Sequence, residues 1–165
     1  CMERDLGDIH KARSLFSEGL VQNPNSGRLL LSLGVLEDVA GNVEKSKGLL
    51  TEGLLLEPNN AFLHHAIAML EYKQGNAGTA RESLRRALSA DKDHTRAWLA
   101  WAQLEEAEGN FNVAREKYVQ GCRARGGRGT VQLWQAWARM EEKHSNDRAA
   151  LDVYSKATRI YRFDV

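Results

Sequence analysis

The fold of this chain is decided by one stretch of sequence, Trp98-Leu-Ala-Trp101-Ala102-Gln-Leu-Glu105-Glu-Ala-Glu-Gly109-Asn110-Phe-Asn-Val-Ala114-Arg115-Glu-Lys-Tyr118-Val-Gln-Gly121. Apolar residues recur along it at the three- and four-residue spacing of a helix face, and Gly109-Asn110 interrupts them once. The stretch therefore predicts two helices that are joined by a short turn.

The rest of the chain repeats this pattern at a fixed interval. A glycine followed by asparagine or aspartate recurs every 34 residues, and a fifth copy with serine follows after 36: Gly7-Asp8, Gly41-Asn42, Gly75-Asn76, Gly109-Asn110 and Ser145-Asn146. Small residues keep the same register five positions further on: Ala12, Ser46, Ala80, Ala114 and Ala150. Such a period is typical of a solenoid, in which each repeat buries its apolar stripe against its neighbours.

We therefore expect an all-α, right-handed superhelical solenoid of antiparallel helix pairs. The two prolines, Pro24 and Pro58, each follow a predicted helix and interrupt none. One helical-repeat domain is expected over residues 1–165, with a leading half repeat at 8–23 and full repeats at 27–58, 61–92, 95–125 and 131–163. Because the chain opens inside a repeat, we expect a fragment of a longer protein, whose further repeats or subunits meet its two ends.

Composition and charge narrow the function classes. The 165 residues are 42% hydrophobic with a formal net charge of +1, which excludes a strongly basic nucleic-acid binder overall. Residues 113–165 nevertheless hold 11 basic and 6 acidic side chains, so the C-terminal third is electropositive. Cys1 and Cys122 are too few for a disulfide framework or a zinc knuckle, which fits an intracellular location. No apolar run is long enough to span a membrane.

The repeat resembles the tetratricopeptide repeat and, more closely, its half-a-tetratricopeptide subfamily of RNA-processing proteins. The resemblance rests on Trp98-x-x-Trp101-Ala102-x-x-Glu105 and its counterpart at Trp134, each a tryptophan pair followed by a glutamate. Phrases such as Met69-Leu-Glu71-Tyr-Lys-Gln-Gly75-Asn76 look most like chloroplast RNA-maturation factors of the high-chlorophyll-fluorescence type. The resemblance implies a protein that binds and protects a transcript end without catalysis, in the chloroplast or the nucleus.

Four recurring glutamates, Glu37, Glu71, Glu105 and Glu141, are the first candidate site. Lys47, Arg81 and Arg115 each stand ten residues after one of the first three. We expect ion pairs between the two helices of one repeat, with a structural role, because nothing in the sequence places two acids in one cleft for acid–base chemistry. We accordingly expect no catalytic residue and no enzyme.

Aromatic side chains and histidines are the second set of candidates. The tryptophans at 98, 101, 134 and 137 are able to stack nucleic-acid bases, but their recurrence favours packing between helices. His64 falls on the tryptophan position and is predicted to be packed, whereas the adjacent His65 is predicted to face the groove. Adjacent histidines on a helix diverge by about 100°, so we expect no metal site and no cofactor.

The concave side of such a repeat is lined by first-helix residues. This rule places apolar and acidic residues in the groove, at Leu31, Val35, Asp38, Met69, Leu99, Glu106 and Glu142. The same rule predicts a groove for RNA or a partner, made of Arg28, Phe62, His65, Tyr72, Lys73, Arg96, Gln103, Gln132, Gln135, Arg139 and Lys143. These residue types suit single-stranded RNA, and equally an extended peptide or a partner helix.

The segment Arg123-Ala-Arg125-Gly-Gly-Arg128-Gly is predicted to be a flexible loop. Its arginines are candidates for contacts to phosphate, and a solvated insertion loop is the competing interpretation. Our hypothesis is a non-catalytic scaffold of an RNA-processing or RNA-maturation factor that binds single-stranded RNA, protein partners or both. The alternative is a scaffold for proteins only; neither needs a small-molecule substrate.

Overall fold

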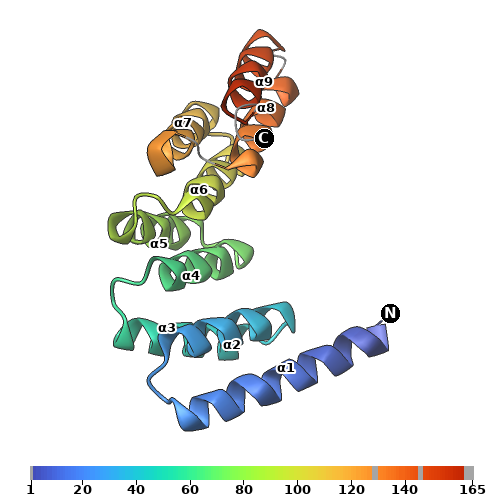
Figure 1. The fold of residues 1–165 in the computed structure, drawn as a ribbon, viewed down its shortest axis with the longest axis vertical. Helices are drawn as coiled ribbons and strands as arrows, with labels where there is room; N and C mark the ends of the chain where they lie inside the picture. Colours follow the sequence, from blue (N-terminus) through green and yellow to red (C-terminus); the bar gives the residue numbers. More distant parts are fainter. Residues whose placement is uncertain (1, 128–129, 145–146, 162–165) are drawn as a thin grey trace. The chain divides into compact units, whose positions relative to one another are not determined.

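The computed structural model describes residues 2–127, 130–144 and 147–161, and every regular element within these ranges is an α-helix (Figure 1). The chain divides into two compact units, residues 1–90 and 91–165. Unit 1 holds α1 (Met2–Gln22), α2 (Gly27–Val39), α3 (Val43–Leu56), α4 (Ala61–Lys73) and α5 (Ala77–Ala90). Unit 2 holds α6 (Thr95–Ala107), α7 (Phe111–Gly127), α8 (Val131–Lys143) and α9 (Asp147–Tyr161). The predicted all-helical fold is confirmed.

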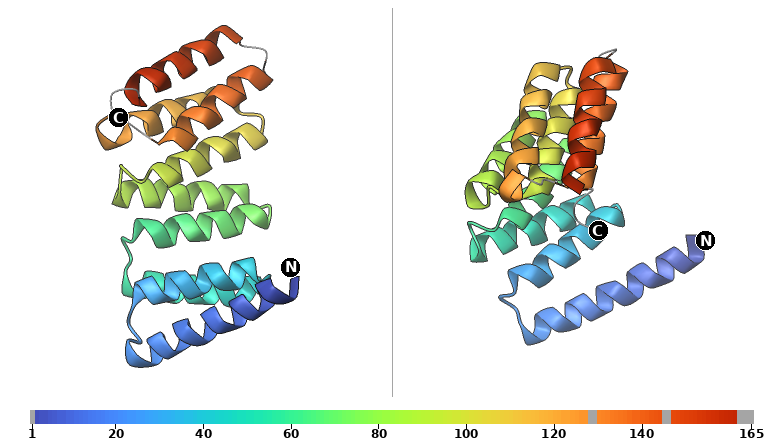
Figure 2. Two further views of the ribbon diagram at one scale, coloured as in Figure 1. Left: turned by 45° about the vertical axis from the view of Figure 1, so that its right-hand side comes forward. Right: turned by 45° about the horizontal axis from the view of Figure 1, so that its top comes forward.

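Consecutive helices pack as pairs within each unit (Figures 1 and 2). We call α2, α4, α6 and α8 the first helices, and α3, α5, α7 and α9 the second helices. In unit 1, α1 occupies the place of a second helix and packs against α2. The first helices also contact one another, α2 with α4 in unit 1 and α6 with α8 in unit 2. One row of first helices therefore runs through each unit.

The small residues of the repeat lie where the paired helices meet. Ser46, Ala80, Ala114 and Ala150 are each at most 2% exposed, so the equivalent positions of the complete pairs share the same buried surroundings. Gly34 shows how close the approach is, because an added Cβ would lie 2.9 Å from Cδ2 of Leu50. The predicted apolar seam between helices is thus confirmed.

Both units bury a continuous apolar cluster around these contacts. In unit 1 the cluster is built from Leu50, Leu63 and Leu70. In unit 2 it is larger and comprises Ala102, Ala114, Tyr118, Cys122, Leu133, Trp134, Ala138, Met140 and Val153. Trp98 and Trp137 pack against the second cluster while partly exposed, so the prediction that the tryptophans lie between helices holds for them. Burying these apolar surfaces is the main source of stability of the pairs.

The turn inside each pair follows one hydrogen-bonded pattern. Gly41, Gly75 and Gly109 have φ of 81°, 81° and 79°, a left-handed conformation that glycine adopts without a steric penalty. In the first of these turns the Asn42 amide donates to the Glu37 carbonyl at 2.8 Å, which closes the helix C-terminus. Asn42 is the N-cap residue of α3, and its side chain donates to the Glu37 carboxylate and makes no capping bond.

Candidate functional site

Predicted groove residues of neighbouring first helices meet directly within each unit. In unit 1, Nζ of Lys73 on α4 lies 2.5 Å from Oδ2 of Asp38 on α2. In unit 2, Nζ of Lys143 on α8 lies 3.5 Å from Oε1 of Glu106 on α6. These contacts bring Asp38 beside Lys73 in unit 1 and Glu106 beside Lys143 in unit 2, so two lysines that had been considered for RNA each lie next to a carboxylate.

Most of the predicted groove residues are open to solvent. His65 and Tyr72 are half-buried, and the others are exposed: Arg28 on α2, Phe62 and Lys73 on α4, Arg96 and Gln103 on α6, and Gln132, Gln135, Arg139 and Lys143 on α8. The two ion pairs between neighbouring first helices were not predicted from the sequence. The signal available for them was the spacing of the paired residues, 35 and 37 positions, which is close to one repeat.

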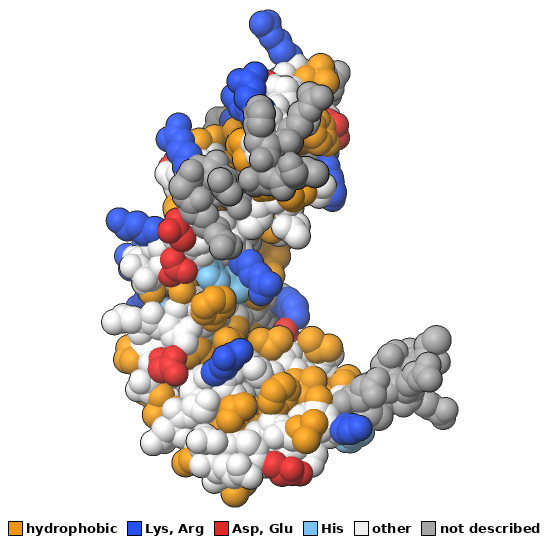
Figure 3. Space-filling view, in the orientation of Figure 1, with side chains coloured by type: hydrophobic (Ala, Val, Ile, Leu, Met, Phe, Trp, Pro, Cys, Tyr) orange, Lys and Arg blue, Asp and Glu red, His pale blue; other side chains and the backbone are white. Residues whose placement is uncertain are grey.

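The face of unit 1 is apolar and aromatic. We define the α2/α4 face as Leu31, Val35, Phe62, His65, Met69 and Tyr72, which lie at helical spacing on the two first helices. Phe62 is 52% and Val35 is 44% exposed, whereas the other four are half-buried. Figure 3 shows hydrophobic side chains gathered on the visible face of unit 1, with isolated charged groups among them. Large apolar side chains grouped at the surface are characteristic of binding faces.

The corresponding face of unit 2 is polar. Gln103, Gln132, Gln135 and Arg139 are all exposed on α6 and α8. Amide and guanidinium groups form directional hydrogen bonds and contribute little apolar surface. The two units therefore present faces of different chemistry from equivalent helix positions.

The recurring glutamates are buried, and Glu37, Glu71 and Glu141 each bind a cation of the preceding helix, which was not predicted. Glu37 is 0% and Glu141 is 1% exposed. The Arg13 guanidinium on α1 contacts both carboxylate oxygens of Glu37, with Nε at 2.7 Å from Oε1 and NH2 at 2.9 Å from Oε2. Arg115 on α7 binds Glu141 on α8 in the same way, at 2.6 Å and 2.8 Å.

A third pair, Lys47 on α3 with Glu71 on α4, has an N–O distance of 2.7 Å. The prediction of pairs between Lys47 or Arg115 and the glutamate of the same repeat is wrong. In these three pairs, a cation on α1, α3 or α7 reaches the glutamate on the first helix that follows, because these helices are neighbours across the repeat boundary. Glu37 also pairs at 2.7 Å with Lys45 on α3, so the expected ion pair within a repeat is present there with Lys45 in place of Lys47. The glutamates therefore hold consecutive repeats in register.

Further side chains donate hydrogen bonds to these carboxylates. Asn42 Nδ2 and Lys45 Nζ each donate to Glu37 at 2.7 Å. The Arg13 guanidinium, together with Lys45 and Asn42, holds the pKa of Glu37 at about 2 although burial alone would raise it. In unit 2 the indole Nε1 of Trp137 donates to Glu141 at 2.9 Å. The hydrogen bonds to Glu37 and Glu141 come from surrounding side chains, which is the arrangement of a structural ion pair.

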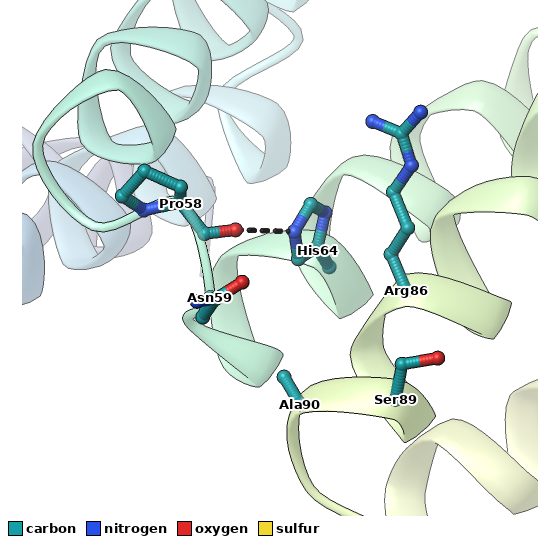
Figure 4. Close-up of a pocket in the computed structure, with 6 residues that line it drawn as sticks. All are labelled: Pro58, Asn59, His64, Arg86, Ser89 and Ala90. Carbon is teal, nitrogen blue, oxygen red and sulfur yellow. Dashed lines mark hydrogen bonds between the residues drawn. The ribbon is translucent and has the colours of Figure 1, made fainter.

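His64 is packed as predicted and borders a pocket (Figure 4). Its Nε2 lies 2.9 Å from the Pro58 carbonyl, which points at the ring in the figure. The pocket of about 510 Å³ lies between the α3–α4 turn, α4 and α5, and is lined by Pro58, Asn59, His64, Arg86, Ser89 and Ala90. Sequence analysis did not single out this pocket.

The predicted arginine loop is largely helical. Helix α7 continues to Gly127, so the prediction of a loop is wrong for residues 123–127. Arg123 is exposed near the end of α7. Ala124 is only 8% exposed, and its burial explains why the helix continues through a glycine-rich sequence. Arg125 belongs to α7, but its side chain is not among those that the structure describes, and Arg128 is not among the described residues.

The described part of the chain offers no cluster of three or more His, Cys, Asp or Glu side chains that could hold a metal ion. Among the same residues, no helix is both long and apolar enough to cross a membrane.

Comparison with known proteins identifies the class of repeat. Residues 61–104, which hold α4, α5 and most of α6, match the family model described as Tetratricopeptide repeat. This segment is similar to a tetratricopeptide repeat, and the chain as described has a helical-repeat fold. No curated protein matches the chain.

Solved structures with the same fold are distant in sequence. The crystal structure of MamA is 18% identical with a TM-score of 0.73, covering 99% of this chain and 94% of that one. TTC0263, a thermophilic repeat protein of Thermus thermophilus, is 18% identical with a TM-score of 0.74, covering 96% and 86%. YrrB, a repeat protein described as having an unusual peptide-binding site, is 16% identical with a TM-score of 0.62, covering 96% and 81%. At these identities the likeness establishes the fold, a helical-repeat solenoid.

Proposed function

We propose that the α2/α4 face binds a segment of a protein partner through that segment's large apolar side chains. The observation that carries this proposal is Phe62, which is 52% exposed at the start of α4 in line with His65, Met69 and Tyr72. An exposed aromatic beside half-buried apolar groups provides the kind of anchor that dominates protein–protein binding energy. Binding requires no chemical step, so the role is that of a scaffold.

Charge on this face also favours a protein partner. Beside this face, Lys73 is paired with Asp38 at 2.5 Å, so the carboxylate reduces the net positive charge that a phosphate backbone would meet there. Nucleic-acid affinity depends on cations that remain available to phosphates. YrrB, a solved structure with a similar fold, is described as having an unusual peptide-binding site, which supports a peptide ligand in this proposal.

The buried ion pairs supply the rigidity that such binding needs. Arg13 with Glu37 and Lys47 with Glu71 join α1 to α2 and α3 to α4. A face whose helices are fixed before binding loses less conformational entropy when the partner binds. The ion pairs in unit 1 therefore support recognition although they do not touch the partner.

A selection experiment with the whole chain tests this proposal. A displayed library of peptides is selected for binding, and the enriched peptides are titrated against the parent chain and Phe62→Ala. We expect enrichment of spaced apolar residues and a loss of affinity of about tenfold or more in Phe62→Ala, as for an interface anchor. Leu55→Ala is the matched control, since Leu55 is 78% exposed on α3 and outside this face. Equal losses in both variants would contradict the proposal.

Single-stranded RNA is the second candidate ligand, and the polar face of unit 2 favours it. Exposed glutamines at 103, 132 and 135 lie with Arg96 and Arg139 on α6 and α8, and such groups suit unstacked bases and phosphates. The resemblance to the half-a-tetratricopeptide repeat and to chloroplast RNA-maturation factors supports this candidate, and with it an RNA-processing role in an organelle or the nucleus. Titration with RNA at several salt concentrations decides: a steep salt dependence that weakens in Arg139→Ala supports it, and no binding at moderate salt excludes it.

A further inference from the structure

A second pocket lies in unit 2 between three helices. It has a volume of about 310 Å³ and is lined by Val119, Cys122, Arg123, Trp134, Trp137 and Lys156. Val119, Cys122 and Arg123 come from α7, the two tryptophans from α8, and Lys156 from α9. We call it the α7/α8/α9 pocket. Its volume is at the lower end of the range of small-ligand sites, roughly 300–1,000 Å³.

The walls of this pocket are apolar and aromatic. The rings of Trp134 and Trp137 are stacked, with centroids 5.9 Å apart and an interplanar angle of 28°. Cys122 is 4% exposed, and burial raises the pKa of its thiol to about 12, so it contributes a neutral wall at physiological pH. Stacked aromatic rings with a neutral thiol beside them favour a flat or bulky apolar group.

Two cations stand at the same pocket. Arg123 is exposed, and within the described part of the chain no ion pair or hydrogen bond of its guanidinium is found. Lys156 already forms an ion pair within α9, because its Nζ lies 2.5 Å from Oδ2 of Asp152 one turn earlier. The available positive charge therefore comes mainly from Arg123. A ligand that complements this pocket carries an anionic group next to its apolar part.

The pocket beside His64 shares two features with the α7/α8/α9 pocket, a ring and a cation at equivalent repeat positions (Figure 4). His64 and Trp134 are both 11 residues before the position of the turn glycine, at Gly75 and Ser145, and Arg86 and Lys156 are both 11 residues after it. Each pocket thus sets a ring on a first helix beside a cation on the paired second helix. Only the unit 2 pocket adds a second tryptophan, because Ile67 stands at the position of Trp137. The two pockets therefore share a ring and a cation, and the unit 2 pocket has the larger aromatic wall.

We propose that the α7/α8/α9 pocket binds an acidic peptide segment of a protein partner, with one large apolar side chain between Val119 and the tryptophans and a neighbouring carboxylate on Arg123. This site goes beyond the α2/α4 face: it lies in the other unit, on other helices, and selects for charge. The two sites can fail independently, because neither shares a residue with the other.

Nuclear magnetic resonance of the whole ¹⁵N-labelled chain tests the proposal directly. Each of the four tryptophans gives one indole N–H signal, so Trp134 and Trp137 report on the pocket and Trp101 is an internal reference. The probe is a terminally blocked Gly-Asp-Phe-Asp-Gly peptide, and the comparison peptides carry Asn for both Asp residues or Gly for Phe. We expect saturable shifts of the Trp134 and Trp137 signals with the first peptide and much weaker shifts with the other two.

Variants of the pocket sharpen the test. Arg123→Ala is expected to weaken binding of the acidic peptide by about twofold to fivefold, the range of an exposed ion pair, and Arg123→Glu to weaken it further. Val119→Phe fills the apolar part and should abolish the shifts while leaving the circular dichroism unchanged. Arg96→Ala is the matched control, an exposed cation of the same unit that does not line the pocket.

Three results would overturn the proposal. The first is equal binding of the acidic and amide peptides, and the second is an effect of Arg96→Ala as large as that of Arg123→Ala. The third is a shift of the Trp134 and Trp137 signals by oligouridylate but not by the acidic peptide, which would make the pocket a nucleic-acid site.

Discussion

Replacing Glu37 by glutamine removes one negative charge from the centre of unit 1 with little change in shape. The carboxylate is 0% exposed and accepts hydrogen bonds from Arg13, Asn42 and Lys45 at 2.7–2.9 Å. A neutral amide keeps one acceptor oxygen and directs its NH2 group toward these donors. We therefore expect Glu37→Gln to weaken the junction between α1 and α2 substantially.

The magnitude follows from the pKa of this carboxyl. The Arg13 guanidinium and the other two donors lower the pKa of Glu37 from 4.5 to about 2. One pKa unit corresponds to about 1.4 kcal/mol, so the folded state favours the charged form by about 3 kcal/mol. Removing one partner of a buried ion pair costs a similar roughly 3–5 kcal/mol. We expect the free energy of unfolding at neutral pH to fall by about 3 kcal/mol.

The pH dependence has a definite sign. The pKa of Glu37 is lower in the folded state than in the unfolded chain, so its stabilisation is complete above the unfolded value near 4.5 and disappears as the pH falls through about 2. The difference between the parent chain and Glu37→Gln should therefore be constant above about pH 5 and approach zero near pH 2.

Urea unfolding followed by far-ultraviolet circular dichroism and by tryptophan fluorescence measures this effect. All four tryptophans lie in residues 91–165, so fluorescence reports on unit 2 and circular dichroism on the whole chain. Glu82→Gln is the control, because the Arg85 and Arg86 guanidinium groups also lower the pKa of Glu82 to about 2, but the Glu82 side chain is 44% exposed. Solvent screens that interaction, so little loss of stability is expected. Equal losses of stability in both variants, or a loss from Glu37→Gln that is independent of pH, would contradict the role assigned to the buried carboxylate.

Further predictions concern single positions. Gly121→Ala would place a Cβ 2.8 Å from Cδ1 of Leu133 and should lower the free energy of unfolding by about 1–3 kcal/mol. Gly48→Ala meets nothing within 4 Å and should raise it by about 0.5–1 kcal/mol, as thermal unfolding of the two variants will show. Gly75→Ala forces a φ of 81° on an alanine and should cost about 1–2 kcal/mol in the same assay; an unchanged melting temperature would contradict this expectation. Cys122, whose burial raises its thiol pKa to about 12, should react with an alkylating reagent far more slowly in the native protein than in urea, as mass spectrometry of its peptide can measure.

Local and periodic features of the sequence predicted the fold well. The turn at Gly41 follows from glycine's access to positive φ, and the burial of Ala80 and Ala114 follows from their recurrence at one repeat position. The packed position of His64 follows in the same way, by comparison with tryptophans at the equivalent place. Such inferences succeed because identical repeats give equivalent residues equivalent neighbours.

Contacts between repeats were not predictable in the same way. Glu71 has a cation 24 residues upstream, Lys47, and another ten residues downstream, Arg81, and periodicity does not distinguish them. The packing of α3 against α4 selects Lys47. Likewise, Lys73 appeared to be a cation available to a ligand until the structure placed Asp38 beside it.

The amino-acid sequence by itself determined the helical repeat, its turns and its buried small residues, because these depend on backbone propensity and on a pattern that recurs along the chain. Only the tertiary structure decided which charges are neutralised, that α7 continues through its glycines, and that Trp134 and Trp137 line a pocket with Arg123. Those outcomes depend on distances between side chains of different helices, which the spacing of residues along the chain does not specify.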